Sequence, residues 1–458
     1  MANKRSRDLR LHGAGRLAIV YRPIAELKRT RVNARFHDKK QIGQIANSIK
    51  AFGFLVPIII DRAGRIIAGH GRLLAAELLG LTHVPTICVE HLSEAQIKAF
   101  MIADNRLTEN SRWDDRLIAQ QLKELSEVVE FDFDIEVTGF AMGEIDLRIE
   151  GLTSESEGAE DAADALPAPQ TGSPVTRLGD VWLLGPHEVG CGSALEEAAL
   201  AALMQDKKAA VVFTDPPYNV AVDGHVSGLG AIKHRDFVMA SGEMSEAEFS
   251  AFLHQALYLL VRYSADGSLH FVCMDWRHLL ELLAVARPVY IELKNLCVWD
   301  KGKGGMGSLY LSQHELIAVF KNGRGPHRNN VQLGQFGRNR TNVWRYPGAN
   351  SFARHSNEGN LLALHPTVKP VQLVADALMD CSARGDIVLD TFLGSGTTVI
   401  AAERTGRRCY GLELDPLYVD TIVRRWQSFT GDSARHAASG RTFDDLEAEA
   451  NENHGERR

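Results

Sequence analysis

Apolar and polar residues alternate in blocks that predict strands, loops and a helix over residues 386–426. Ile387–Leu389 has the pattern of a buried strand and ends at Asp390. A glycine-rich loop follows, then a helix closed by Gly406, and then a second apolar strand that ends at Glu413. Such a βαβ unit has parallel strands and a right-handed crossover, and its ligands bind beyond the carboxyl ends of the strands. The pattern therefore predicts a ligand site beside Asp390 and Glu413.

A second buried strand is predicted at Val211–Phe213, and it runs into Thr-Asp-Pro-Pro-Tyr. Pro216 and Pro217 have fixed φ angles and donate no backbone hydrogen bond, so the segment after Asp215 is stiff. One interpretation is a rigid turn with a solvated carboxylate and a packed Tyr218. The other is a site that needs a carboxylate and a carbonyl group at a fixed spacing.

The first part of the chain predicts a smaller α+β domain within residues 1–150. Apolar residues at helical spacing from Ile42 precede two strands, 55–60 and 65–67, that flank a turn. Gly69 then opens a second helix.

Composition divides the 458-residue chain into two folded parts. Residues 151–174 are acidic and rich in Ala, Pro, Ser and Gly, with no Lys or Arg, so they predict a flexible linker. Residues 175–430 form the larger folded part, and residues 431–458 are predicted to be a polar, poorly ordered tail.

Charge, apolar runs and cysteines limit the class of protein. The net charge is −7, and no apolar run approaches the ~20 residues of a membrane span. The six cysteines are scattered without a Cys-x-x-Cys pair, which favours a reducing compartment and argues against a metal site. We therefore expect a cytoplasmic protein that binds no membrane and no metal.

The loop after Asp390 limits the ligand. A phosphate-binding loop needs Gly-Lys-Ser/Thr, but Gly396 is followed by two threonines, and Val399 stands where a dinucleotide loop has its third glycine. Gly394 and Gly396 allow a ligand to approach the backbone closely. Glu413, 17 residues after Gly396, is placed to accept the two hydroxyl groups of a ribose. A ligand with a ribose but no phosphate fits these features, and S-adenosylmethionine is the obvious one.

One long stretch between the two strands is basic. Residues 316–357 contain no Asp or Glu, while aromatic residues are interleaved with seven Lys and Arg residues. A charge run is most often a solvated face, but this length without an acid in an acidic chain favours contact with double-stranded DNA. The predicted DNA-binding residues are Arg324, Arg328, Arg338, Arg340 and Arg345.

Residues 175–430 resemble a β-class DNA amino-methyltransferase, which implies a Rossmann-like α/β fold that binds S-adenosylmethionine. The resemblance rests, in this order, on a DPPY box at 215–218, an HPT-x-KP segment at 365–370, a cofactor loop at 392–396 and a Gly-Leu-Glu at 411–413. It implies that the catalytic residues are Asp215, Pro216, Pro217 and Tyr218. The cofactor-binding residues that it implies are His365, Pro366, Thr367, Lys369, Asp390, Phe392, Gly394, Gly396 and Glu413.

This resemblance implies methyl transfer to the N6 amine of adenine, in a base that is rotated out of the duplex. Within the family, Asp rather than Ser at position 215 favours adenine. Cytosine N4 methylation is the alternative within the class. The alternative outside it is a ParB-like DNA-binding protein with a degenerate methyltransferase domain. A homodimer and a restriction partner are compatible with either enzyme.

Residues 17–110 resemble a ParB-like N-terminal domain, on the stretch Ile-Ile-Ala-Gly-His-Gly-Arg that begins at Ile66. In nucleotide-binding members, backbone amides and arginines at this box hold a phosphate at a helix N-terminus. The chain keeps Gly69 and Arg72 but lacks the double arginine of many members, which argues against nucleotide hydrolysis and nuclease activity. The alternative is a glycine turn followed by a helix-capping arginine.

Overall fold

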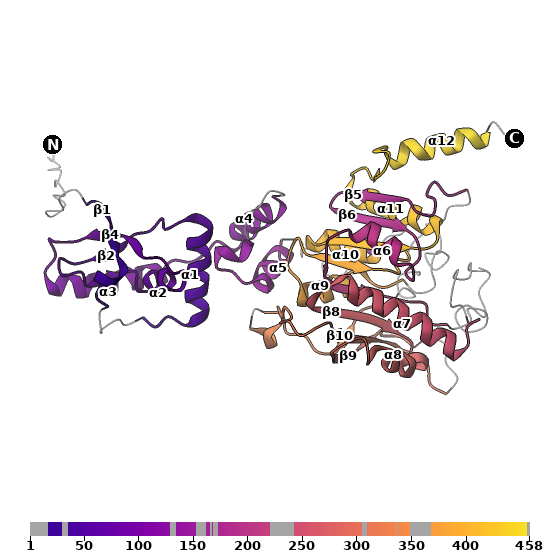
Figure 1. The fold of residues 1–458 in the computed structure, drawn as a ribbon, viewed down its shortest axis with the longest axis horizontal. Helices are drawn as coiled ribbons and strands as arrows, with labels where there is room; N and C mark the ends of the chain where they lie inside the picture. Colours follow the sequence, from indigo (N-terminus) through magenta and orange to yellow (C-terminus); the bar gives the residue numbers. More distant parts are fainter. Residues whose placement is uncertain are drawn as a thin grey trace, which may run out of the picture. The chain divides into compact units, whose positions relative to one another are not determined.

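The computed structural model describes residues 17–29, 35–128, 134–152, 162–164, 167, 173–219, 242–304, 309–335, 337–348 and 368–455. The chain divides into two compact units, Met1–Ala141 and Met142–Arg458 (Figure 1). The described residues form a four-stranded sheet in the first unit and a ten-stranded sheet in the second. Helices accompany both sheets, so the predicted mixed α/β fold class is confirmed.

The first unit is a small sheet with helices packed against it. Its elements are β1 (Ile19–Pro23), α1 (Lys39–Phe52), β2 (Ile58–Ile60), β3 (Ile66–Ala68), α2 (His70–Leu78), β4 (His83–Cys88), α3 (Glu94–Glu109) and α4 (Asp115–Glu127), with 3-10 turns η1 (Ile24–Glu26) and η2 (Ile135–Thr138). The strand order is β1-β4-β2-β3, with β4 antiparallel to β1 and parallel to β2. Ile58, Ile60 and Leu73 are buried together, so the apolar runs read from the sequence form the core of this unit.

The second unit is a Rossmann-like sheet. Its strands are β5 (Val181–Leu184), β6 (His187–Cys191), β7 (Ala209–Thr214), β8 (Ser264–Met274), β9 (Glu292–Asp300), β10 (His314–Lys321), β11 (Val343–Arg345), β12 (Ile387–Asp390), β13 (Arg408–Glu413) and β14 (Arg435–His436). Their order is β11-β9-β10-β8-β7-β12-β13-β6-β5-β14. The predicted βαβ unit is confirmed, because β12 and β13 pair in parallel.

Helices cover both faces of this sheet (Figure 1). The helices of this unit are α5 (Met142–Glu150), α6 (Glu197–Met204), α7 (Glu246–Arg262), α8 (Leu279–Ala286), α9 (Val371–Cys381), α10 (Thr397–Thr405), α11 (Pro416–Thr430) and α12 (Phe443–Gly455), of which α6 to α11 cover the sheet. Successive strand residues face opposite sides, so Val211 and Phe213 pack with α9, α10 and α11, while Val212 packs with α6, α7 and α8. Burial on both faces explains why β7 is apolar throughout.

The polar residues of the predicted site lie along one edge of the sheet. β8, β7, β12, β13 and β6 run parallel, so their carboxyl ends lie along one edge. Asp215 follows β7, Asp390 ends β12, and Glu413 ends β13. β10 runs antiparallel to β8 and therefore begins at this same edge, with His314 and Glu315. The topology thus brings Glu315 to the edge that carries Asp215.

The second unit begins at Met142, earlier than the predicted start at residue 175. Its first helix, α5, packs against α9. Asp146 of α5 is fully buried, and its carboxylate binds Arg407 at 2.7 and 2.9 Å and Arg384 at 3.1 Å. Residues 142–150, which fall within the predicted N-terminal domain of residues 1–150, therefore belong to the second unit.

Part of the predicted flexible linker is docked on the second unit. Ala163 is buried in the core, and its carbonyl oxygen accepts a hydrogen bond from Arg425 at 3.0 Å. The Asp164 carboxylate accepts a hydrogen bond from the backbone N–H of Val371, the first residue of α9, at 2.8 Å. The linker prediction is therefore corrected at residues 162–164, which are held by these contacts.

The predicted tail is also anchored. β14 pairs with β5, and the fully buried ring of Phe443 lies 5.0 Å from that of Trp182. Arg424 of α11 forms an ion pair with Glu447 of α12. The prediction of a poorly ordered tail is wrong for these segments, because a short strand and one aromatic residue fix them to the core.

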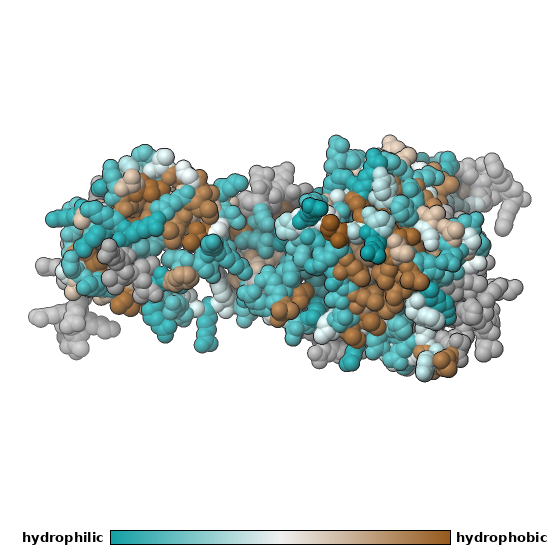
Figure 2. Space-filling model, turned by 60° about the horizontal axis from the view of Figure 1, so that its bottom comes forward, coloured by the Kyte–Doolittle hydropathy of each residue, from teal (hydrophilic) through white to brown (hydrophobic). Residues whose placement is uncertain are grey.

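Hydrophobic side chains remain on the surface of the second unit. Tyr258 of α7, Leu280 of α8 and Leu293 of β9 are exposed. Figure 2 shows hydrophobic patches among hydrophilic residues on one face of the molecule. No helix in the described part of the chain combines the length and apolar character needed to cross a membrane.

The substitution Asp146→Asn tests the unit boundary in the full chain. It should lower the free energy of unfolding by about 3–5 kcal/mol, because Arg407 stays buried without its carboxylate partner. Urea denaturation measures this loss, with Asp432→Asn on the exposed surface as the matched control. Equal stability of the Asp146→Asn and wild-type proteins would remove α5 from the second unit.

Candidate active site

The DPPY segment turns away from the sheet directly after β7. The Tyr218 hydroxyl donates a hydrogen bond to Oδ1 of Asp215, so the two side chains form one polar group at the sheet edge. The Asp215 side chain is 20% exposed, and Pro216 is buried. Asn219 has a φ of 53°, and its side chain accepts hydrogen bonds from the backbone N–H groups of Gly242 and Met244 at 3.1 and 3.2 Å. These contacts fix the end of the turn.

A lysine lies between two carboxylates at this edge. Lys369 Nζ is 2.5 Å from Oδ2 of Asp215 and 3.0 Å from Oε2 of Glu315, and it donates to the Tyr218 hydroxyl at 3.3 Å. Its side chain is 4% exposed. Oε1 of Glu315 accepts a hydrogen bond from Lys301 at 2.7 Å. The residues Asp215, Lys369, Glu315 and Lys301 therefore form a chain of alternating charges, called here the charge chain.

Burial and charge oppose each other in the charge chain. Burial raises the pKa of Asp215, and the Lys369 ammonium works against this rise. Burial would also raise the pKa of Glu315, but Lys369 and Lys301 lower that pKa to about 2. Burial would lower the pKa of Lys369, but the two carboxylates raise it above its usual value. The lysine is therefore held as an ammonium.

Asp390 joins the strand ends to the glycine-rich loop. Its carboxylate accepts hydrogen bonds from the Thr214 hydroxyl at 3.0 Å, the Thr398 hydroxyl at 2.6 Å and the backbone N–H of Phe392 at 3.0 Å. Burial raises the pKa of Asp390 to about 6. These contacts give Asp390 an anchoring role, while its contact with a cofactor stays a prediction.

Glu413 faces the glycine-rich loop from the end of β13. Its Oε2 accepts the backbone N–H of Gly394 at 2.8 Å, and its Oε1 accepts that of Asp415 at 2.9 Å. Burial raises the pKa of Glu413 to about 7. Gly396 has a φ of 81°, and a Cβ there would lie 3.0 Å from the side chain of Ile422, so glycine is required.

The structure brings most of the predicted site residues to one sheet edge. Lys369, predicted to bind the cofactor, contacts the predicted catalytic Asp215 and Tyr218. Its contact with a cofactor stays a prediction. The predicted cofactor residues His365, Pro366 and Thr367 lie outside the described residues.

Sequence reasoning missed Glu315 and Arg425 as site residues. Glu315 lies at the start of the apolar run of β10, and the available signal is that an acid at such a position is rarely buried without a partner. Arg425 lies on the buried side of α11 next to Trp426, and it donates to the Ser395 carbonyl of the glycine-rich loop at 3.0 Å.

The basic stretch is partly buried, which corrects the prediction for two arginines. The Arg338 side chain is 6% exposed and forms ion pairs with Asp376 and Asp380 at 3.1 Å and Glu150 at 3.3 Å. Arg340 forms ion pairs with Asp376 at 2.9 Å and Asp380 at 2.7 Å. These guanidinium groups hold α9 and are not presented to DNA.

The other predicted DNA-binding residues are more accessible. Arg345 ends β11 at the edge that carries Asp215, and its side chain is 83% exposed, with Asp300 at 4.0 Å. Arg324 is exposed and Arg328 is half-buried. DNA contact by these three residues stays a prediction.

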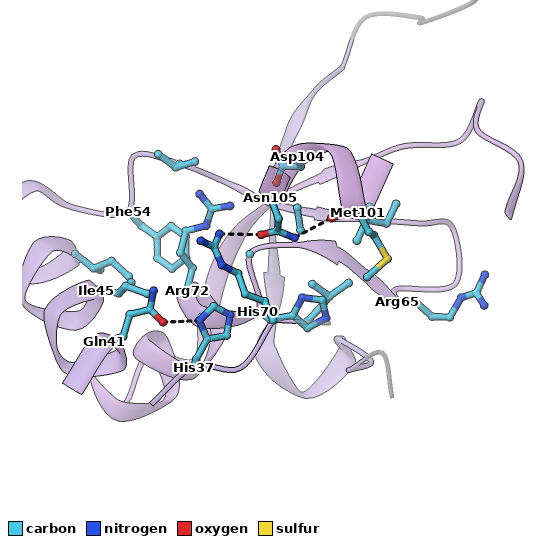
Figure 3. A pocket seen from close by; sticks show the side chains of 18 of the residues that line it. His37, Gln41, Ile45, Phe54, Arg65, His70, Arg72, Met101, Asp104 and Asn105 are labelled. Carbon is cyan, nitrogen blue, oxygen red and sulfur yellow. Dashed lines mark hydrogen bonds between the residues drawn. The ribbon is translucent and has the colours of Figure 1, made fainter. Parts of the chain in front are cut away.

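The first unit contains a separate cavity of about 930 Å³ (Figure 3). Gly69, with a φ of 101°, precedes α2, and a Cβ on it would lie 3.1 Å from the Arg72 guanidinium. Arg35 donates to the Asn105 side chain at 2.9 Å across the cavity. Burial lowers the pKa of both Arg72 and His70. The structure thus places the predicted Gly69 and Arg72 on one cavity, and nucleotide binding there stays a prediction.

Comparisons with known proteins match three stretches of the chain. Residues 209–424 match a family described as DNA methylase of the N6/N4 type, residues 13–105 match the ParB N-terminal domain, and residues 116–178 match the helix-turn-helix domain of ParB-methyltransferase proteins. The fold and the sheet-edge site define the class of Rossmann-like DNA methyltransferases. More particularly, the chain combines a DNA methylase domain of the N6/N4 type with a ParB-like N-terminal domain.

Individual relatives cover the two parts separately. The ParB-like nuclease domain-containing protein YnaK of Escherichia coli K12 is 48% identical over 81 residues, which are 18% of this chain and 93% of YnaK. The type II methyltransferase M2.MboI of Moraxella bovis is 23% identical over 233 residues, which are 49% of this chain and 83% of that protein. The structure of the PvuII cytosine-N4-specific DNA methyltransferase is similar at 16% identity and a TM-score of 0.40, over 53% of this chain and 86% of that one.

The substitutions Arg338→Met and Arg345→Met should separate the buried arginines from the exposed one. Arg338→Met should lower the free energy of unfolding by about 1.5–3 kcal/mol, because Asp376 and Asp380 lose a charged hydrogen-bond donor and keep only Arg340. Arg345→Met should change it by less than about 0.5 kcal/mol. Chemical denaturation of the two variants measures both values, and similar losses would contradict the assignment.

Proposed function

We propose that the protein transfers a methyl group from S-adenosylmethionine to the N6 amine of adenine at a specific site in double-stranded DNA. The observation that carries this proposal is the Asp215 carboxylate, held at the carboxyl end of β7 beside the glycine-rich loop that follows β12. The match to DNA methylases of the N6/N4 type supports the reaction class, while the choice of adenine rests on Asp215 by resemblance.

The chemistry of the amine explains why the site needs two acceptors. An exocyclic amine is a poor nucleophile because its lone pair is delocalised into the ring. The Asp215 carboxylate and the Pro216 carbonyl oxygen would each accept one of its N–H groups and so direct the lone pair toward the methyl group. The consecutive prolines keep both acceptors at a fixed spacing before the substrate arrives.

The residues at the ends of β12 and β13 suit S-adenosylmethionine. Glu413 uses one lone pair of each oxygen for a backbone N–H, and each oxygen keeps a second lone pair for a ribose hydroxyl group. The loop over residues 390–398 contains no Lys or Arg, so it lacks the charge that a phosphate would need. When bound, S-adenosylmethionine supplies an electrophilic methyl group.

After transfer, the amine nitrogen carries one proton in excess, and Asp215 is placed to accept it. Tyr218 would stack on the rotated base. We propose that Arg345 contacts the DNA, because its guanidinium group is exposed at the edge that carries Asp215. Arg324 and Arg328 follow the opposite end of β10, and their contact with DNA stays a prediction. A homodimer, a cytoplasmic location and a restriction partner stay predictions.

The modified base and the Asp215→Asn variant test this function together. Nucleosides from DNA incubated with protein and labelled S-adenosylmethionine should contain N6-methyladenine, identified by mass spectrometry. Asp215→Asn should lower the single-turnover rate by about 10²–10³-fold while cofactor affinity stays near wild type, because the carboxylate acts mainly in the transition state. N4-methylcytosine would contradict the choice of adenine, and undiminished transfer by Asp215→Asn would contradict the catalytic role.

The raised pKa of Glu413 predicts a pH dependence of cofactor binding. A carboxyl group with a pKa of about 7 is ionised above that pH and loses acceptor capacity below it. S-adenosylmethionine affinity should therefore fall as the pH drops through about 7. Glu413→Gln should weaken binding by about 1.5–3 kcal/mol and flatten the dependence. Calorimetry across pH measures this, with the exposed Glu246→Gln as control, and a pH-dependent Glu413→Gln would exclude Glu413 as the titrating group.

A further inference from the structure

The catalytic carboxylate in the proposed function does not stand alone. Its Oδ2 lies 2.5 Å from Lys369 Nζ, and the same ammonium lies 3.0 Å from Glu315 Oε2. Aromatic rings flank the ammonium, with the ring centroids of Tyr218 and Trp299 at 5.6 and 5.8 Å. A lysine with so little exposure needs compensating charge, and here two carboxylates from different elements provide it.

The two carboxylates come from different elements of the fold. Glu315 lies on β10, where it pairs with Trp299 of β9, one residue before the pairing of β10 with β8 begins. Its second oxygen accepts a hydrogen bond from Lys301, which follows β9. Asp215 instead lies in a turn after the end of β7. Glu315 is therefore held within the sheet, and Lys369 connects it to the catalytic group.

We propose that Glu315 and Lys369 are a positioning pair, in which Glu315 fixes the Lys369 ammonium and Lys369 holds the Asp215 carboxylate ionised and oriented for the target amine. This inference rests on the proposed role of Asp215. With Lys369 on Oδ2 and the Tyr218 hydroxyl on Oδ1, the plane of the carboxylate is set by two donors. Each oxygen keeps a lone pair, so an amine N–H can be accepted without displacing the lysine.

The charges around Asp215 predict how its pKa should change when each member of the pair is replaced. Lys369 faces it from the segment before α9, Glu315 from β10, Cys273 from β8, Asp390 from β12 and Tyr218 from its own turn. Lys369 is the cation among these groups. Removing the lysine should therefore raise the pKa of Asp215, whereas removing the charge of Glu315 should lower it. A general loss of packing would not move one titration in opposite directions.

The experiment compares Lys369→Met and Glu315→Gln in the full-length protein. The first readout is the pH profile of single-turnover methyl transfer at saturating DNA and S-adenosylmethionine. The acidic limb should move to higher pH in Lys369→Met and to lower pH in Glu315→Gln, each by about one unit or more. Lys207→Met is the matched control, because it also breaks a lysine–carboxylate pair, with Glu188 at 3.0 Å, but precedes the amino end of β7. Its profile should coincide with that of the wild type.

A second readout does not depend on activity. Carbon-13 NMR of aspartate-labelled protein, with the Asp215 signal identified by its loss in Asp215→Asn, follows the ionisation of Asp215 directly. Opposite shifts of its titration midpoint in the two variants would support the positioning pair, whether or not the protein methylates an amine. A protein that methylates no amine would refute only the proposed function. Lys369→Arg keeps the charge, so its titration midpoint should stay near that of the wild type. An unchanged midpoint in Glu315→Gln or in Lys369→Met would overturn the pair, and if Lys369→Met fails to fold, Glu315→Gln decides.

Discussion

The ion pair between Asp215 and Lys369 is the interaction on which the arrangement of the site depends. A carboxylate at the carboxyl end of a buried strand is costly unless a cation stays beside it, and a lysine that is 4% exposed is equally costly without carboxylates. Each residue therefore makes the burial of the other possible. Glu315 and Lys301 extend this compensation into the sheet, so the charged group is connected to β10 and to the end of β9.

The sheet topology explains how residues so distant in sequence meet. The carboxyl ends of parallel strands share an edge, which places Asp215, Asp390 and Glu413 together. The antiparallel β10 adds its beginning to this edge and so contributes Glu315. Asp390 then joins the DPPY turn to the glycine-rich loop. Its carboxylate binds Thr214, which precedes the DPPY turn, and Thr398, which follows the glycine-rich loop. A reaction between a cofactor and a base needs both segments in one place, and the sheet supplies this.

Sequence patterns predicted the local parts of this structure well. The strands before Asp215, Asp390 and Glu413 carry continuous apolar runs because both faces of the sheet are covered, and such runs are visible in the sequence. The distant partners of charged side chains could not be predicted from the sequence. Arg338 and Arg340 looked like a DNA surface because their carboxylates, Asp376 and Asp380, lie on α9, outside the basic stretch.

The predicted segment boundaries were wrong for the same reason, because they depend on partners that are distant in the sequence. The polar composition of residues 151–174 concealed Ala163 and Asp164, each of which is held by a distant residue, Arg425 or Val371. Similarly, nothing in the sequence around Asp146 indicates its buried partner Arg407, which is 261 residues away. Composition describes the average of a segment, whereas docking depends on one or two side chains and on their distant partners.

The most direct test of the central claim is a crystal structure of the protein with target DNA and an unreactive analogue of S-adenosylmethionine. The account predicts that the rotated base presents its amine nitrogen at about 3 Å from an Asp215 carboxylate oxygen and from the Pro216 carbonyl oxygen. Lys369 should remain on Asp215 and Glu315 in that complex. An amine bound away from Asp215, or a Lys369 that has left Asp215 for the cofactor, would contradict the account.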